Sequence, residues 1–343
     1  MILILISTLP LLSLISSLLL AAPTQQWVER EAYVMGTTLR ITVVARSRPE
    51  GARAIEEAFQ SVRRVDGLLS TWRDDSEIAR LNQAPVGQSV LLSPSLYLLL
   101  RDAARWTRLT GGAFDPAIGS LVDAWDLRGR GRIPSRETLA RARAAGGMGH
   151  FTFTDSAHTV SRNDSASWLD TGGFGKGAAL GEARLALLRR HVTAGRLNFG
   201  GQVLVIGPDP SGADWPVPVA HPARRAEPAA WLHLRDRSAS TSSQSERFVT
   251  IGGKALGHVL DPRTGRPVPA WGSVTVVAEN PAAADAVSTA LLVLGPEEGS
   301  KWAEGRDDLG ILFLIERDGR VVPRWNRALE RYLAVDSTLS GGG

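Results

Sequence analysis

The chain of 343 residues contains no cysteine. Disulfide bonds, thiolate metal sites, cysteine nucleophiles and a lipid-modified cysteine at the start of a lipoprotein are therefore excluded. Lysine is almost as scarce, because 36 of the 39 basic residues are arginine and only three are lysine. Since arginine serves here wherever a general positive charge is needed, a lysine in a special place indicates a need for a compact ammonium group.

Basic residues form no stripe interleaved with aromatic side chains, and the formal net charge is only +4. Basic residues spread along a chain are typical of a solvated surface, so we expect no nucleic-acid partner. The length suits one large domain or two ordinary ones, and neither an internal repeat nor a long linker divides the chain.

Charged residues are also missing from the start of the chain, where none precedes Glu29. The first 22 residues are apolar and end in Ala21-Ala22, which favours a secretory signal cleaved after Ala22. A basic segment at the start is lacking, and the apolar run is long enough to span a bilayer, so a retained membrane anchor is the alternative. We expect an exported protein, in the periplasm or on the outer face of the inner membrane.

The remainder divides into a domain over 23–338 and a short tail over 339–343, which ends in glycines and is expected to be disordered. Helical spacing and strand alternation are mixed along the domain, which predicts an α+β fold. The predicted helices include Ala178–His191 and Asn280–Leu294, and short strands dominate from Leu197 onwards. A hairpin is predicted at the end, with Asp318-Gly319 at its turn.

The stretch Leu169–Ala183, LDTGGFGKGAALGEA, holds four glycines and one of the three lysines, Lys176. It is not a P-loop, because Asp170 replaces the first glycine of that motif and Gly177 replaces its serine or threonine. The dinucleotide fingerprint fits only in its loose form. Glycines before a helix nevertheless let backbone N–H groups approach an anion, so the stretch predicts an anion site.

Three other stretches are rich in groups that chemistry uses. Asp115 precedes a proline, and His258 lies three residues before Asp261. Asp285, Ser288 and Thr289 have the spacing of one helix face. A carboxylate with hydroxyls is a hard oxygen set that suits Mg²⁺ far better than Zn²⁺.

Together these stretches resemble the ApbE family of flavin transferases. The resemblance runs from about Val34 to Gly295, in the order YVMGTTLRITV, LLSTWRDDSEIARLN, TGGAFDPAIGSLV, DTGGFGKG, LNFGGQV, TSSQSERF, HVLDPRTGRPV and ADAVSTALLVLGPEEG. It implies an ApbE-like (T-fold-like) fold, with mixed, mostly antiparallel sheets flanked by helices.

The resemblance also implies an activity. The family takes FAD as substrate, moves its FMN half onto a threonine hydroxyl of an acceptor flavoprotein through a phosphoester bond, and releases AMP. It uses Mg²⁺, with Mn²⁺ as a substitute. The implied acceptors are subunits of Rnf-type complexes and of the sodium-pumping NADH:quinone reductase.

Site residues are carried over by their place in the matching stretches. Those implied to contact FAD are Met35, Trp72, Ala113, Phe114, Asp115, Asp170, Lys176, His258 and Val259. The metal is implied to lie between Gly173, through its carbonyl, Asp285 and Thr289, with Ser288 nearby. His258, as general base, and Asp285 are the implied catalytic residues. Lys176 and the metal would offset the charge that builds toward the AMP leaving group.

Two departures from the family pattern matter. Trp72 stands where the family usually has another aromatic residue, and an indole stacks on a flavin at least as well. Ser243, Gln244 and Ser245 replace a glycine, an acid or amide, and a tyrosine. The alternatives are therefore an FAD pyrophosphatase, in which water replaces the threonine, and a non-catalytic periplasmic FAD-binding protein.

Each of these residues also has a purely structural interpretation when taken alone. Asp115 fits a turn, His258 a strand and Asp285 the first turn of a helix. Three further tryptophans, Trp106, Trp125 and Trp168, have no implied role and are expected in the core.

Overall fold

The structure, a computed structural model, describes residues 26–244, 248–251 and 254–333. The predicted leader and tail, and Ser245, lie outside the described residues.

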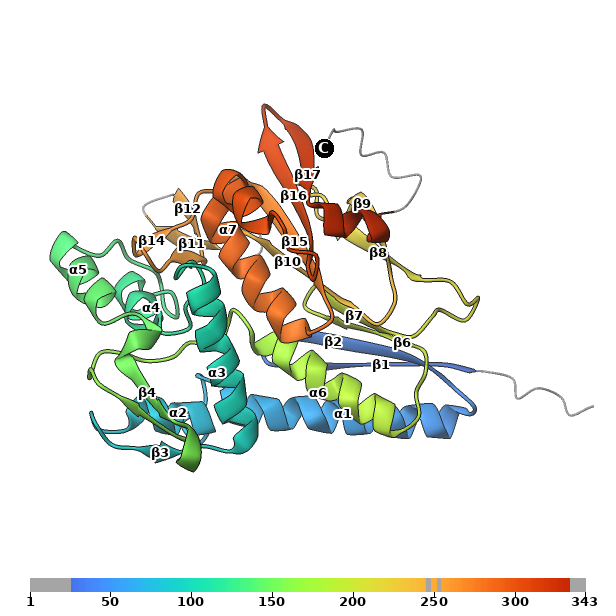
Figure 1. Cartoon of the computed structure of the whole chain (residues 1–343), viewed down its shortest axis with the longest axis horizontal. Coiled ribbons are helices and arrows are strands. Elements are labelled where there is room, and N and C mark those ends of the chain that lie inside the picture. The colour runs from blue at the N-terminus through green and yellow to red at the C-terminus, as the bar shows by residue number, and fades with distance from the viewer. Residues whose placement is uncertain (1–25, 245–247, 252–253, 334–343) are drawn as a thin grey trace, which may run out of the picture.

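An eight-stranded sheet forms the centre of the molecule (Figure 1). Each strand is antiparallel to its neighbours. The order across the sheet is β1 (Gln26–Val34), β2 (Thr37–Ala45), β6 (Gly195–Phe199), β7 (Gln202–Ile206), β10 (Ser238–Ser243), β15 (Gly272–Ala278), β16 (Gly310–Arg317) and β17 (Arg320–Trp325).

Three long helices cover one face of this sheet, as Figure 1 shows: α1 (Arg48–Leu69), α6 (Gly175–Arg189) and α7 (Pro281–Ala303). Ser47 caps the N-terminus of helix α1, because its hydroxyl accepts a hydrogen bond from the N–H of Glu50. Its apolar residues recur at helical spacing and face the sheet, where Ile55 and Val62 are fully buried. The other face is covered by the hairpin of β8 (Trp215–Ala220) and β9 (Pro228–Leu234) and by η3 (Arg327–Tyr332).

The remaining helices and a three-stranded sheet lie at one end of the helical layer. They are α2 (Glu77–Gln83), α3 (Pro94–Leu109), α4 (Gly119–Trp125), α5 (Arg136–Ala144), η1 (Met148–His150) and η2 (Asp155–Ala157), with the strands β3 (Val90–Leu91), β4 (Phe151–Thr154) and β5 (Thr159–Arg162). Two short hairpins, β11 (Phe248–Ile251) with β12 (Lys254–Gly257) and β13 (Leu260–Asp261) with β14 (Arg266–Pro267), complete the chain.

The α+β prediction is confirmed, and so is the final hairpin, where Asp318 and Gly319 both have positive φ. Two helices differ from their predicted extents. Helix α6 begins at Gly175, three residues earlier than predicted, because tertiary packing overrides the low helix propensity of glycine. Helix α7 resumes after a kink at Gly295 and continues to Ala303 instead of ending near Leu294.

Within the described ranges, none of the helices combines the length and the apolar character that crossing a bilayer requires.

Candidate active site

The glycine-rich stretch forms the turn that leads into α6. Thr171 Oγ1 donates to the last carbonyl of α1 at 2.8 Å, and the N–H of Gly172 donates to Asp170 Oδ1 at 2.8 Å. These bonds fix the turn before the helix begins. Because α6 starts at Gly175, Lys176 belongs to its first turn. The positive end of the helix dipole therefore lies beside the turn, which favours a bound anion.

Asp285 is a buried carboxylate at the contact between α6 and α7. Its side chain is 4% exposed, and its Oδ1 lies 3.4 Å from Nζ of Lys176. Its Oδ2 accepts the N–H of Gly177 at 3.0 Å. Glycine is required at 177, because a Cβ there would stand 2.2 Å from the carbonyl oxygen of Pro281. The lysine of the glycine turn and the carboxylate of α7 thus meet at one point.

The two hydroxyls that follow Asp285 on α7 face different neighbours. Ser288 is fully buried, and its Oγ lies 3.2 and 2.9 Å from two hydroxyls of β10, those of Ser240 and Ser242. Thr289 faces the glycine turn, since a Cβ on Gly173 would lie 3.6 Å from Thr289 Oγ1. Ser288 therefore supports the site from beneath, whereas Thr289 and Gly173 lie together beside the turn.

Thr289 and the turn at Gly173 lie close to Asp285. A carboxylate, a hydroxyl and a backbone carbonyl are oxygen ligands of the kind that Mg²⁺ prefers. Among the residues that the structure describes, no group of three or more histidine, aspartate or glutamate side chains is placed to hold a metal ion. A cation here would therefore be held by one carboxylate, neutral oxygens and substrate phosphates, which is how Mg²⁺ is commonly bound with nucleotides.

Met35, Ala113 and Phe114 also border the glycine turn or lie beneath it. Met35 has φ of 49° in the turn between β1 and β2, and a Cβ on Gly175 would lie 3.4 Å from its Cε. Phe114 is buried beneath Gly173, whose Cβ would be 3.2 Å from the Phe114 ring. Ala113 is 1% exposed. Met35 can offer its side chain to a ligand, whereas Ala113 and Phe114 shape the floor.

Trp72 is an exposed aromatic side chain held by an arginine. Its side chain is 74% exposed, and the guanidinium of Arg128 lies 4.7 Å from its ring centre and 4.5 Å from that of Trp168. Arg128 also donates to Asp170 Oδ2 at 2.9 Å and to the carbonyl of Thr71 at 2.9 Å. Arg128 therefore holds the indole of Trp72 in one orientation while leaving it exposed, and the same arginine links it to Asp170.

Asp115 is a largely desolvated carboxylate. Burial raises its pKa to about 6, although the N–H groups of Ala117 and Met148, which donate to its two oxygens at 2.8 and 3.2 Å, oppose the shift. These bonds give Asp115 the turn role that its sequence context allows. The carbonyl of the next residue, Pro116, accepts the N–H of Asp170 at 2.7 Å, so this turn adjoins the glycine turn.

His258 and Val259 are held by Gln244. The Gln244 amide accepts the N–H of Val259 at 3.2 Å and donates to the carbonyls of Val259 and Val268 at 2.9 and 2.8 Å. Gly257 leaves room for this amide, because a Cβ there would stand 1.9 Å from Gln244 Oε1. The residue that departs from the family pattern thus positions the segment that carries the histidine, whose side chain is half-buried.

Sequence reasoning missed two of these contributors, Arg128 and Ser240. Arg128 lies among other arginines, and only folding places it between two indoles. Trp106 and Trp125 are buried as predicted, but Trp168 is only half-buried because it stacks on Arg128. Ser240 Oγ lies 3.5 Å from Asp285 Oδ1, a contact from β10 that no local spacing indicates.

Known proteins resemble this chain along most of its length. The model of the ApbE family matches residues 35–313. The FAD:protein FMN transferase of Vibrio cholerae is 27% identical over 317 residues, which cover 90% of this chain and 94% of that protein. The FAD:protein FMN transferase of Treponema pallidum is 32% identical over 293 residues, which cover 78% of this chain and 79% of that protein.

Two solved structures have a similar fold. The flavin transferase ApbE from Vibrio cholerae superposes with a TM-score of 0.80 at 25% identity, covering 90% of this chain and all of that one. The ApbE protein from Thermotoga maritima superposes with a TM-score of 0.83 at 27% identity, with the same coverage.

Proposed function

The chain belongs to the ApbE family and is an FAD:protein FMN transferase, and we propose that it carries out the transfer where Lys176, Asp285 and Gly173 meet. The observation that supports this place is the junction of α6 and α7. One helix start, one ammonium and one buried carboxylate are brought together there beside a glycine turn. The positive end of the helix dipole and the ammonium both favour the negative charge of a pyrophosphate.

The proposed reaction exchanges one phosphorus–oxygen bond for another. The hydroxyl oxygen of an acceptor threonine attacks the phosphorus on the FMN side of FAD. The bond from that phosphorus to the bridging oxygen breaks, and AMP leaves with that oxygen. The hydroxyl proton passes to a base, for which we propose His258, the histidine on the segment that Gln244 fixes.

Lys176 supplies a positive charge close to the bond that breaks. Negative charge builds on the leaving AMP as the bond lengthens, so an ammonium held beside the pyrophosphate stabilises the transition state more than the ground state. Asp285 holds that ammonium at 3.4 Å. A guanidinium would bring a wider, planar group to the same position.

We also propose that Mg²⁺, with Mn²⁺ as a substitute, is held by Asp285, Thr289 and the carbonyl of Gly173, with Ser288 behind them. When bound, the cation would draw negative charge from the phosphate oxygens. The donor chemistry fits, since all the donors are oxygen atoms and a single buried carboxylate leaves room for phosphate ligands.

The flavin half of FAD would stack on Trp72. Arg128 orients this indole while leaving it 74% exposed. Met35, Asp115, Asp170 and Val259 would contact other parts of FAD, as the family resemblance implies.

The proposed acceptors are exported or membrane-bound flavoproteins with a modified threonine, of the Rnf type or of the sodium-pumping NADH:quinone reductase type. Export by the apolar leader would bring the enzyme to them. This is checked by mass spectrometry of the N-terminal peptide from the native envelope fraction. A start near Ala22 or Pro23 supports cleavage and an intact Met1 in the membrane supports an anchor, whereas an intact Met1 in the soluble cytoplasm excludes export.

The function itself is tested by following three products. The chain from Pro23 retains every described element, since the first begins at Gln26. It is incubated with FAD and Mg²⁺, with and without a peptide that carries an acceptor threonine. A transferase gives one AMP per flavinylated peptide, and a pyrophosphatase gives AMP and free FMN without the peptide. A carrier gives neither, which would contradict the proposed function.

A further inference from the structure

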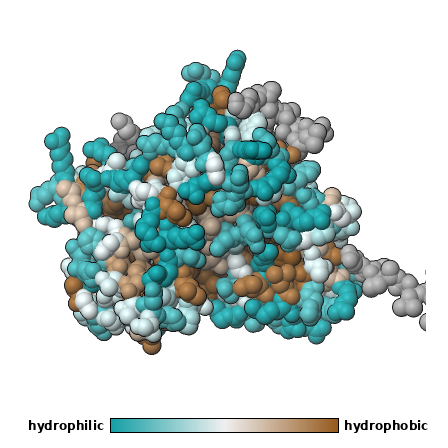
Figure 2. Space-filling model, viewed as in Figure 1, coloured by the Kyte–Doolittle hydropathy of each residue, from teal (hydrophilic) through white to brown (hydrophobic). Residues whose placement is uncertain are grey.

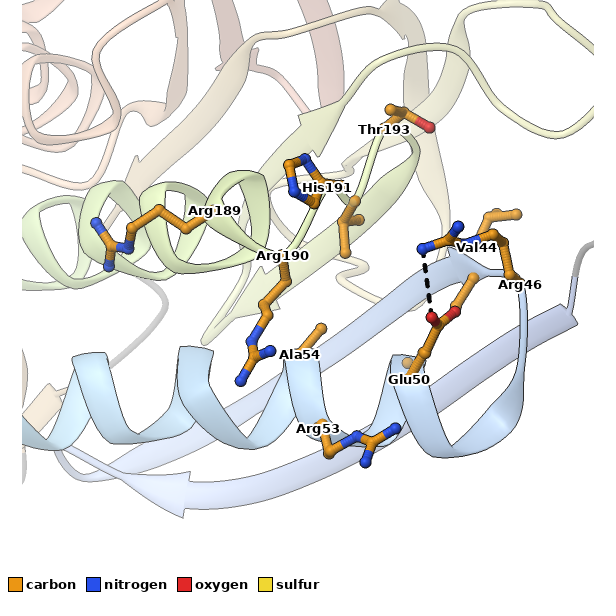
Figure 3. A pocket seen from close by; sticks show the side chains of 12 residues that line it. Val44, Arg46, Glu50, Arg53, Ala54, Arg189, Arg190, His191 and Thr193 are labelled. Atoms are coloured by element: carbon orange, nitrogen blue, oxygen red, sulfur yellow. Dashed lines mark hydrogen bonds and ion pairs between the residues drawn. The ribbon is translucent and has the colours of Figure 1, made fainter.

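A hollow of about 790 Å³ lies where the C-terminal end of α6 meets the start of α1 and the end of β2 (Figure 3). Four arginines line it, Arg46, Arg53, Arg189 and Arg190, together with His191 and one carboxylate, that of Glu50. Arg190 points from the end of α6 toward α1, and Arg46 points toward Glu50. We call this surface the arginine end.

Positive charge exceeds negative charge at the arginine end. Arg46 pairs with Glu50 at 3.3 Å, and Arg190 pairs with Glu57 of α1. For Arg53 and Arg189 the described part of the chain provides no salt-bridge partner, and both side chains are exposed. Two guanidinium groups therefore face solvent without a bound carboxylate, next to two paired ones.

Exposed apolar side chains accompany these charges. Leu185 and Leu188, on the last turns of α6, are 47% and 41% exposed. Figure 2 shows brown side chains low on the molecule, over the region where α6 runs. Leucine beside arginine on one helix is a composition found where amphipathic helices meet the headgroup layer of a bilayer.

The described chain begins at this same end. Strand β1 starts at Gln26, which pairs with Ala45, and Ala45 lines the hollow. The uncharged, apolar segment that precedes it, residues 1–22, is the part of the sequence suited to a membrane. The arginine end is therefore the end of the fold at which the described chain begins.

We propose that the arginine end docks on the surface of an anionic phospholipid bilayer, with Arg53 and Arg189 facing the headgroup phosphates. Arginine binds phosphate through a planar fork, and each basic residue close to an anionic surface strengthens attachment several-fold. Helix α6 has 15 residues, so Lys176 at its other end stands about 20 Å from the arginine end. Docking would leave Lys176, at the other end of α6, away from the surface that contacts the membrane.

The test measures binding of the chain from Pro23 to vesicles by flotation at 50 mM and 300 mM salt. One set of vesicles contains phosphatidylcholine with 30% phosphatidylglycerol, and the other phosphatidylcholine alone. The variant Arg53→Glu/Arg189→Glu reverses two charges that no described salt bridge uses. The matched control, Arg80→Glu/Arg105→Glu, makes the same charge change on the exposed surfaces of α2 and α3.

We expect wild type and control to bind the anionic vesicles within about twofold of each other. The Arg53/Arg189 variant is expected to bind at least tenfold more weakly, and high salt to weaken wild-type binding, because exposed charges are screened. Equal binding by the variant and the control would overturn the proposal, as would no preference of the wild type for anionic lipid. AMP release from FAD in solution is expected to be unchanged in both variants, so this result is independent of the transferase assay.

Discussion

Nζ of Lys176 lies 3.4 Å from Oδ1 of Asp285, so an ammonium in the first turn of α6 pairs with a buried carboxylate of α7. A positive charge at a helix N-terminus is unfavourable by itself, and the carboxylate offsets it. The pair also keeps the ammonium beside the glycine turn, where a pyrophosphate would bind.

Replacing Lys176 tests both roles of this pair. Lys176→Ala leaves the buried carboxylate with the N–H of Gly177 as its main donor, so the free energy of unfolding is expected to fall by about 1 to 3 kcal/mol. Chemical denaturation of the apo-protein measures the change, and an unaltered unfolding midpoint would argue against the pair.

Lys176→Arg is expected to be far from conservative. It keeps the charge but brings a wider, planar group into a space bounded by Gly177 and Asp285. FAD should therefore raise the melting temperature less than in wild type, as linkage requires of a weaker ligand, and turnover should fall further. Equal FAD-induced shifts in the two proteins would mean that Lys176 does not bind the pyrophosphate.

Trp72 is expected to contribute to binding and not to folding, because its side chain is 74% exposed. Trp72→Ala should raise the KM for FAD about three- to tenfold, the value of one stacking contact, with a nearly unchanged melting temperature of the apo-protein. Trp72→Tyr is the matched control and should retain most of the affinity. An unchanged KM in Trp72→Ala would contradict the proposed flavin platform.

The raised pKa of Asp115 predicts that the free energy of unfolding depends on pH. Its folded pKa of about 6 lies above the ordinary value of 3.8, so the folded protein binds the proton more tightly than the unfolded chain. This contribution is fully present below about pH 4 and is lost as the pH rises through about 6, for a total of about 3 kcal/mol. Denaturation of wild type and Asp115→Asn between pH 4 and pH 8 measures it, and a constant difference between them would contradict the raised pKa.

Gln244 is expected to act by positioning His258. Gln244→Ala removes three hydrogen bonds that fix Val259 and Val268, so the transfer rate should fall at least tenfold while the FAD-induced melting shift is largely kept. Ser243→Ala, on the same strand end, is the matched control and should stay within about twofold of wild type. A fall in FAD binding equal to the fall in rate would indicate that Gln244 shapes the FAD pocket instead.

The local signals in the sequence predicted much of this structure. Ser93 and Pro94 mark the start of α3, and the spacing of apolar residues indicates α1. The Asp318-Gly319 pair indicates the turn of the last hairpin. Each of these signals depends only on residues that are neighbours in the sequence. The start of α6 could not be placed in this way. The glycines there disfavour a helix locally, and the need for a glycine at 177 becomes apparent only from the close approach of α7.

The same distinction between local signals and long-range contacts applies to the candidate site. Asp285 and Thr289 share a helix face, so their spacing predicts their proximity. The contacts of Arg128 with Trp72 and Trp168, and of Ser240 with Asp285, join residues more than 39 positions apart. Such contacts follow from the arrangement of the sheet and helices, which the spacing of residues does not encode.

Asp285 provides the most direct test of the proposed transfer site. AMP release and flavinylation of an acceptor peptide are measured at saturating FAD for wild type and Asp285→Ala, with Mg²⁺ and with EDTA. We predict that EDTA abolishes both products in wild type, that Mg²⁺ or Mn²⁺ restores them, and that Asp285→Ala lowers the rate at least about a hundredfold, the scale of losing a charge-stabilising group. Full activity of Asp285→Ala in the presence of EDTA would contradict both the metal and the assignment of this junction as the transfer site.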